Sequence, residues 1–332
     1  MRGPSIVADV PGECVIGVDL GGTKAIAGAV DSRLGVHYRT RREVPTADLP
    51  ALLQTLTEIV EEVRSAIGSD VEAVGFGIPC LIDQDRGLAA SSVHLPINGI
   101  AFADVMAERL GLPTFMDNDG NLALLAEHRF GAAQGERNAV MLTLGTGIAG
   151  GILVGGEIYR GSQGAAGEFG HMVVWADGPV CGGGCPNRGC LEALVSGTAL
   201  VREALTVAQR KPQSKLGMAL ASGREITGPL VTELGHDGDP DALALLAGIG
   251  EWLGIGLTNI VNIFNPDVVV IGGGVIAAGE LFLAPARRVL SERALALPAE
   301  HVEVLAAHFG AESGMLGAAV FAREQLGRRV RA

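Results

Sequence analysis

The feature that most constrains this chain is a pattern that occurs twice. Residues 15–31, VIGVDLGGTKAIAGAVD, and residues 140–154, VMLTLGTGIAGGILV, both contain a β-rich run, a glycine-rich turn with a threonine, and a second β-rich run. Residues 19–23 align with residues 143–147. Each copy predicts a β-hairpin, and the repeat predicts two lobes, each opened by one hairpin. A chance match in a glycine-rich chain is the alternative, but the alternation matches on both sides of each turn.

Composition agrees with two lobes and narrows the class of protein. With 332 residues, of which 48% are hydrophobic and 19% charged, the chain can bury one large core or two medium ones. Its net charge of -12 and isoelectric point near 5.1 disfavour a nucleic-acid partner, because such a partner usually requires a basic face.

The distribution of apolar residues and cysteines predicts a cytoplasmic protein with no membrane partner. Residues 1–10 lack the continuous apolar stretch of a secretory signal. Five cysteines are too few for a disulfide framework and fit a reducing compartment. The most apolar long segment, residues 242–264, is interrupted by Glu251, Asn259 and Asn262, and therefore predicts a buried helix.

Strand patterns alternate with helix patterns along the chain, which predicts the α/β class. Besides the two hairpins, the expected strands cover residues 36–44, 71–79, 113–117, 267–274 and 303–306. The expected helices cover residues 49–67, 102–110, 121–130, 241–264, 281–297 and 313–326.

Three glycine-rich turns follow β-rich runs, at residues 21–24, 145–147 and 272–274. One such turn can be mere geometry, because glycine takes positive φ at little cost. Three together favour phosphate binding, in which backbone N–H groups cradle phosphate oxygens and missing Cβ atoms let a nucleotide come close.

Residues 145–150, GTGIAG, also match the dinucleotide fingerprint G-x-G-x-x-G. That fingerprint requires a helix after the turn, whereas the following residues predict a second hairpin strand. A dehydrogenase is therefore disfavoured. The chain contains no Walker motif G-x-x-x-x-G-K-[ST], which argues more firmly against a P-loop kinase.

A cluster of cysteines predicts a structural zinc site. Cys181, Cys185 and Cys190 lie in CGGGCPNRGCLE, and His171 lies ten residues upstream. Three thiolates and one imidazole complete a tetrahedral site that is closed to substrate. The alternative is a set of unliganded thiols, but free cysteines are usually buried singly. Cys14 and Cys80 are expected to be packing residues.

The segment TFMDNDGN, residues 114–121, places Asp117, Asn118, Asp119 and Asn121 in one turn between a predicted strand and a predicted helix. We call this the acidic turn. Asn118 or Asp119 can cap the helix, but four polar side chains exceed what one cap requires. A carboxylate at the carboxyl end of a strand lies where open α/β sheets place ligands, and could accept a proton from a substrate hydroxyl.

Five motifs together resemble the ROK family of sugar kinases, and within it the bacterial glucokinases. They are VDLGGTK, DNDGNLALLAEHRFG, LTLGTGIAGG, GAAGEFGH and CPNRGCLE. The resemblance implies two ribonuclease-H-like domains of the actin and hexokinase type, with a nucleotide and sugar cleft between them. It also implies phosphorylation of the 6-hydroxyl of glucose by ATP, with Mg²⁺ and a structural Zn²⁺.

The resemblance carries roles to residues that match the family motifs. Asp119 matches the general base, and Asp19 the residue near magnesium. Sugar contacts are matched by Asn118, Glu168, His171 and Glu192, with His171 also matched to the zinc. The phosphate loops are matched by Gly21, Gly22, Thr23, Lys24, Gly145, Thr146 and Gly147, and a stretch near the adenosine by Gly272 and Gly273.

The resemblance also implies a domain division and a homo-oligomer, dimer or tetramer. The small domain is expected to cover residues 1–117 with the C-terminal helix 313–332, and the large domain residues 118–312 with the zinc loop 171–190. Three departures leave the loop geometry and the preferred hexose open: the C-x₃-C spacing with Pro186, and His94 and Cys80 in place of the usual asparagine and glycine.

The function therefore has open alternatives. Sister kinases of the family act on fructose, mannose, N-acetylmannosamine or allose. Polyphosphate is the alternative to ATP as phosphoryl donor. A non-catalytic sugar-sensing protein would be expected to lack Asp119. Repressors of the family carry a helix-turn-helix domain ahead of the first hairpin, where this sequence has about a dozen residues.

Overall fold

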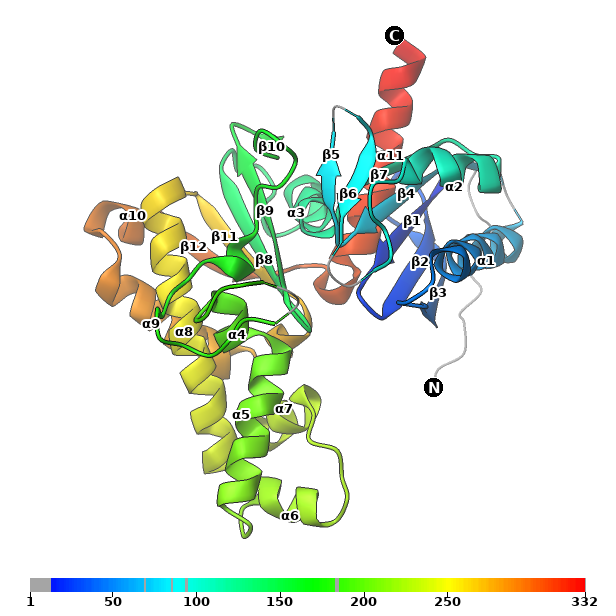
Figure 1. Ribbon diagram of the computed structural model, residues 1–332. Helices are drawn as coiled ribbons and strands as arrows, with labels where there is room; N and C mark the ends of the chain where they lie inside the picture. The colour runs from blue at the N-terminus through cyan, green and yellow to red at the C-terminus, as the bar shows by residue number, and fades with distance from the viewer. Residues whose placement is uncertain (1–12, 69, 85, 93–94, 183–184, 332) are drawn as a thin grey trace. The chain divides into compact units, whose positions relative to one another are not determined.

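The computed structural model describes residues 13–68, 70–84, 86–92, 95–182 and 185–331 (Figure 1). These residues form two compact units. Unit 1 comprises the described residues of Met1–Gly135, Gly151–Gly167 and Glu312–Ala332, and unit 2 comprises those of Glu136–Gly150 and Glu168–Ala311. The domain boundary expected after residue 117 remains a prediction.

Unit 1 contains the first hairpin in a mixed five-stranded sheet. The strands are β1 (Cys14–Leu20), β2 (Lys24–Val30), β3 (Val36–Glu43), β4 (Val71–Ile78) and β7 (Thr114–Asn118), in the order β3-β2-β1-β4-β7. β2 runs antiparallel to β1 and β3, while β4 runs parallel to β1 and β7. The predicted hairpin is confirmed.

Helices cover both faces of this sheet. α1 (Leu49–Ile67) and α2 (Phe102–Leu110) bury their apolar residues in one core with Ile16, Val18 and Phe76 of the sheet. Because side chains alternate along a strand, the neighbouring Gly17 and Gly75 face the other side. A Cβ on either glycine would lie 2.0 Å from a backbone oxygen of α11 (Ser313–Arg331), so this helix packs directly on the strands. α3 (Asp119–Phe130) and a small hairpin of β5 (Leu81–Asp83) and β6 (Leu88–Ser91) also belong to unit 1.

The second five-stranded sheet has the order β10-β9-β8-β11-β12. Its strands are β8 (Ala139–Leu144), β9 (Ile148–Val154), β10 (Glu157–Ile158), β11 (Val268–Gly272) and β12 (Glu303–Ala306). β11 runs parallel to β8 and β12, whereas β10 runs antiparallel to β9. β8 and β9 are neighbours, as the second hairpin predicts, and GTGIAG leads into a strand. The prediction that a strand and not a helix follows this turn, which disfavours a dinucleotide site, is therefore confirmed.

The helices of unit 2 are α4 (Leu191–Val195), α5 (Gly197–Arg210), α6 (Lys215–Ala221), α7 (Gly228–His236), α8 (Pro240–Phe264), α9 (Glu280–Arg293) and α10 (Ala296–His301). The single helix predicted over residues 281–297 is wrong. The backbone is extended at Ala294 and Leu295, and the Leu295 N–H donates to Asn262 Oδ1 at 3.0 Å, which separates α9 from α10.

α8 is the buried helix that the apolar segment predicts. Asp239 caps it by accepting from the Ala242 N–H, and it ends at Asn265 in the left-handed conformation. Within the described part of the chain, α8 is the helix whose length and apolar composition would suffice to span a membrane. Of its most apolar window, 56% is buried inside the structure, and core helices meet the same criterion.

Candidate active site

The acidic turn joins β7 to α3, and Asn118 provides the helix cap. Its Oδ1 accepts hydrogen bonds from the N–H groups of Gly120, at 2.9 Å, and Asn121, at 3.2 Å. Asp119 is the first residue of α3 and is half-buried. Its Oδ1 accepts from the Gly120 N–H at 3.0 Å. The capping function therefore belongs to Asn118, and the Asp119 carboxylate lies at the positive end of the helix dipole.

Asp19 lies near the end of β1, in the same unit as Asp119. Burial raises the pKa of Asp19 to about 7, and the charge of Asp119 adds to this increase. α11 begins beside this carboxyl, since a Cβ on Gly314 would lie 2.6 Å from Asp19 Cγ. Two carboxylates that repel each other fit a hard divalent cation such as Mg²⁺, which would relieve that repulsion.

The raised pKa of Asp19 predicts a pH dependence of stability in the metal-free chain. The folded chain holds this proton up to about pH 7, whereas the unfolded chain releases it near the ordinary aspartate pKa of 3.8. The free energy of unfolding therefore falls as pH rises from about 4 to about 7. Asp19→Asn should remove a decline on the order of 1–4 kcal/mol. Thermal unfolding at pH 5 and pH 8 measures it, and an unchanged pH dependence in the variant would contradict the assignment.

The two hairpin turns have different surroundings. At the first, the Gly21 N–H donates to the Lys24 carbonyl at 2.8 Å, and Lys24 is exposed at the start of β2. At the second, the N-terminus of α5 holds the turn, because the Gly197 N–H donates to the Gly145 carbonyl at 2.8 Å and Thr198 Oγ1 donates to the Thr146 carbonyl at 2.8 Å.

The glycines of the three glycine-rich turns differ in what a side chain at each position would meet. Gly273 has a φ of 84°, which favours glycine. A Cβ on Gly147 would lie 2.4 Å from Glu192 Oε2, so a side chain there would displace that carboxylate. A Cβ on Gly145 would meet no atom within 4 Å. Neither packing nor a positive φ explains Gly145.

Unit 2 brings three of the predicted sugar-binding residues together. Glu192, in the first turn of α4, accepts from the Ile148 N–H through Oε2 at 2.8 Å. Glu168 Oε2 lies 4.0 Å from His171 Nε2. Burial of its carboxyl raises the pKa of Glu168; His171 opposes this increase, and the charge of Glu192 adds to it. The predicted Asn118 and Asp119 belong to unit 1.

The four predicted zinc ligands also come together. One ligand atom each from His171, Cys181, Cys185 and Cys190 lies within 4.8 Å of all the others. His171 Nδ1 is 3.6 Å from Cys181 Sγ, and the sulfurs of Cys185 and Cys190 are 4.0 Å apart. Zinc–sulfur bonds of about 2.3 Å in a tetrahedron require sulfur–sulfur distances of about 3.8 Å, so the cluster fits the ion.

The ring of His171 can serve both predicted roles. Nδ1 faces the sulfur cluster, and Nε2 faces the Glu168 carboxylate. A carboxylate opposite the second nitrogen is the usual way in which a zinc-bound histidine is oriented. Burial raises the pKa of the thiols of Cys181 and Cys190, and neighbouring thiols add to the increase at Cys181. Thiolates gathered there therefore require a cation among them.

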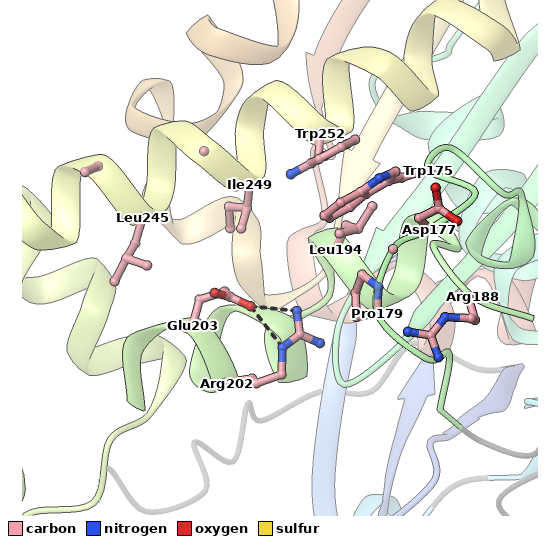
Figure 2. A pocket seen from close by; sticks show the side chains of 13 residues that line it. Trp175, Asp177, Pro179, Arg188, Leu194, Arg202, Glu203, Leu245, Ile249 and Trp252 are labelled. Carbon is pink, nitrogen blue, oxygen red and sulfur yellow. Dashed lines mark hydrogen bonds and ion pairs between the residues drawn. The ribbon is translucent and has the colours of Figure 1, made fainter. Parts of the chain in front are cut away.

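The loop of residues 171–190 packs on α8 through two tryptophans. Trp175 stacks on Trp252 with ring centroids 5.4 Å apart and an interplanar angle of 11°. The rings line a cavity of about 560 Å³ together with Leu194, Ile249 and Arg188 (Figure 2). None of the predicted site residues lines this cavity. It was not predicted from the sequence, since its walls come from distant segments.

The two cysteines outside the cluster, and His94, have different outcomes. Cys14 is fully buried in β1, as a packing residue would be. Cys80 is also buried, and its thiol donates to the Leu81 carbonyl at 3.1 Å. Burial raises the pKa of Cys80 to about 11, and the charge of Asp119 contributes, so Cys80 lies in the field of the proposed base. His94 lies outside the described residues.

Two buried pairs could not be predicted from the sequence. The Asp117 carboxylate is 1% exposed and pairs with Arg160, which follows β10. Glu127 is fully buried and accepts a hydrogen bond from Ser313 Oγ at 2.9 Å, which joins α3 to the start of α11. Each partner lies far along the chain, and a single sequence contains no local signal for either pair.

Comparison with known proteins supports the expected fold and family. A curated glucokinase from Streptomyces coelicolor is 34% identical over 314 residues, which cover 93% of this chain and 97% of that protein. A putative xylose repressor from Caldicellulosiruptor is 31% identical over 76% of this chain and 63% of its own length. A crystal structure of a ROK family glucokinase from Streptomyces griseus, in complex with glucose and AMPPNP, matches with a TM-score of 0.85 and 36% identity. It covers 94% of this chain and 99% of that chain.

The expected fold class is confirmed by that structural match: a mixed α/β chain with two five-stranded mixed sheets and the actin-like two-domain fold. The profile described as the ROK family matches residues 15–325, which include both hairpins, the acidic turn and the cysteine cluster. The chain therefore belongs to the ROK family.

Proposed function

We propose that this protein is an ATP-dependent hexose kinase that phosphorylates the 6-hydroxyl of glucose. The observation that carries the proposal is the position of Asp119, a half-buried carboxylate at the carboxyl end of β7 and the start of α3. Open α/β sheets bind ligands at this end of their strands. The 34% identity to a glucokinase over 93% of the chain supports glucose as the acceptor.

In the proposed reaction, Asp119 accepts the proton of the 6-hydroxyl as its oxygen bonds to the terminal phosphorus of ATP. The bond from that phosphorus to the bridging oxygen breaks, and ADP leaves. Phosphoryl transfer depends mainly on alignment and on neutralisation of charge. Mg²⁺ supplies part of that neutralisation when it is bound, and Asp19 would hold it. The proton acceptor has to be ionised, which its position at the positive end of the α3 dipole favours.

The hydrogen bonds within the chain indicate which atoms remain for the sugar. Asn118 Oδ1 already accepts from two backbone N–H groups, so its side-chain NH₂ group is the part that would donate to a sugar oxygen. Glu192 uses Oε2 for the Ile148 N–H, and its Oε1 would accept from a sugar hydroxyl. Glu168 and His171 Nε2 complete the proposed set. Several such contacts orient one hexose with its 6-hydroxyl toward the base.

The space at Gly145 predicts a selective effect on nucleotide binding. Gly145→Ala should leave the fold intact, because its Cβ would meet no protein atom within 4 Å. It should raise the KM for ATP about tenfold, which corresponds to about 1.4 kcal/mol, if phosphate oxygens occupy that space. Steady-state kinetics at varied ATP concentration measure this change.

The matched control is Gly228→Ala at the start of α7, where a Cβ also meets nothing within 4 Å. This variant should retain the wild-type KM for ATP. An equal KM in both variants would show that the second hairpin turn does not approach the nucleotide.

The test of the function itself is a phosphorylation assay over glucose, fructose, mannose, N-acetylmannosamine and allose, with ATP or polyphosphate as donor. We expect the highest kcat/KM for glucose with ATP. Preference for another hexose would reassign the acceptor within the same mechanism. Sugar binding by calorimetry without phosphorylation of any hexose would favour a non-catalytic sugar-sensing protein. The similarity to a putative xylose repressor supports that alternative.

We also propose a cytoplasmic enzyme that assembles as a homodimer or homotetramer. All five cysteines are free of disulfides, which agrees with a reducing compartment. Light scattering of the purified chain measures the number of subunits.

A further inference from the structure

The proposed reaction gives Asp117 no direct role, yet its carboxylate connects much of the acidic turn. It accepts five hydrogen bonds, two from Arg160 and one each from the Asn118 N–H, the Asn121 side chain and the Gln84 side chain. Only 1% of the side chain is exposed. A buried carboxylate is tolerated only where it is paired and hydrogen-bonded, so each partner matters.

The two oxygens of Asp117 have separate partners. Oδ1 accepts from the Asn118 N–H at 2.8 Å and from Asn121 Nδ2 at 3.2 Å, which fixes both sides of Asp119. Oδ2 accepts from Arg160 Nε at 2.9 Å and Nη2 at 2.5 Å. The guanidinium therefore grips one oxygen with two donors and fixes the direction in which the other oxygen meets the turn.

Arg160 itself stands on a backbone that is fixed at several points. Its Nη1 donates to the Ile158 carbonyl at 3.4 Å, and its own carbonyl accepts from the Ala166 N–H at 3.1 Å. The loop that follows packs on β5, because a Cβ on Gly164 would lie 1.8 Å from the Ile82 oxygen. All of these residues belong to unit 1, as does the acidic turn.

We propose that Arg160 is a positioning residue for the phosphoryl transfer: through Asp117, it holds the acidic turn so that Asn118 and Asp119 meet the hexose in the reactive geometry. This inference rests on the proposed function. A reacting group misplaced by about 1 Å can lose about 10²-fold in rate, so a residue that never touches the substrate can control turnover. Lysine cannot replace the two-donor grip, because an ammonium is a point charge.

Kinetics of Arg160→Gln and Arg160→Lys test the inference. We expect Arg160→Gln to lower kcat about 10²-fold while the KM for ATP stays near the wild-type value. Arg160→Lys should recover about a tenth of the wild-type kcat. Lysine restores the positive charge, but it lacks the two fixed N–H donors of the guanidinium. The matched control is Arg42→Gln, also in unit 1, because Arg42 pairs with Glu62 at 2.6 Å and is 35% exposed against 29% for Arg160.

Hydrogen exchange of the full chain gives a readout that does not depend on activity. Peptides over residues 114–125 should exchange faster in Arg160→Gln than in wild type or Arg42→Gln. If Arg160→Gln does not fold, Arg160→Lys serves both measurements.

The outcomes separate the two proposals. Wild-type kcat in both Arg160 variants, or an equal loss of kcat in Arg42→Gln, overturns the inference while the kinase assignment stands. If the wild type phosphorylates no hexose, the proposed function fails and hydrogen exchange alone decides. Unchanged exchange in Arg160→Gln then overturns the inference that Arg160 holds the acidic turn in place, and faster exchange supports it.

Discussion

Asp119→Asn is expected to lower the turnover of hexose phosphorylation by about 10²–10⁴-fold, the range for loss of a general base. Asparagine has nearly the same shape as aspartate, so α3 and the cap supplied by Asn118 should persist. Nucleotide affinity should change little, because the substitution leaves the glycine turns intact. Turnover from rapid-quench or coupled assays, together with nucleotide binding by calorimetry, measures both quantities.

The control for this substitution is Asp104→Asn, another aspartate in the first turn of a helix, here α2. It should turn over at the wild-type rate. Substantial residual turnover in Asp119→Asn would mean that another group takes the proton. A side effect is also expected: loss of the Asp119 charge removes one cause of the raised pKa of Asp19. The pH dependence of stability should therefore weaken in Asp119→Asn.

The parts of this molecule that could be predicted from the sequence are those with local signals. The first hairpin, the cap at Asn118 and the ends of α2 and α8 depend on glycine, asparagine and alternating apolar residues within a few positions. The cysteine cluster is also local, since its ligands lie between His171 and Cys190. Such features arise from steric and hydrogen-bonding preferences that each short segment carries by itself.

The parts that could not be predicted depend on contacts between distant segments. α9 ends at Arg293, where a carboxamide of α8 binds the Leu295 N–H, although the apolar spacing continues to residue 297. The helices α5, α6 and α7 are a different case, because a local signal was present and was not used: the side chains of Ser196, Ser214 and Thr227 cap them and could have indicated their starts.

The acidic turn shows the same limit within one site. Four polar side chains predict that the turn does more than start a helix, and the structure divides their tasks. Asn118 caps α3, while Asp117 and Asn121 bond to each other inside the unit. Which aspartate would be buried could not be read from the sequence, because burial of Asp117 depends on Arg160, 43 residues away. The choice of Asp119 as the base came from the family motif.

Removing the proposed zinc ligand Cys190 is expected to produce the largest loss of stability. Wild-type protein should contain about one zinc per chain, and Cys190→Ser should contain much less, because a closed site loses one of its four ligands. Loss of a metal site costs on the order of 3–5 kcal/mol. At about 2–4 °C per kcal/mol for large domains, the melting temperature should fall by about 6–20 °C. Elemental analysis and thermal unfolding measure the two effects.

The position of the cluster predicts how this loss would reach the sugar. Cys190 directly precedes α4, which carries Glu192, and His171 lies three residues after Glu168. The KM for the hexose should therefore rise more than the KM for ATP. The matched control is Cys14→Ser, a buried cysteine of β1 outside the cluster, which should keep its zinc. Freshly purified wild-type protein without metal would refute the zinc site. A Cys190→Ser variant that loses zinc but keeps its hexose KM would show instead that the loop holds Glu192 and His171 in place without the ion.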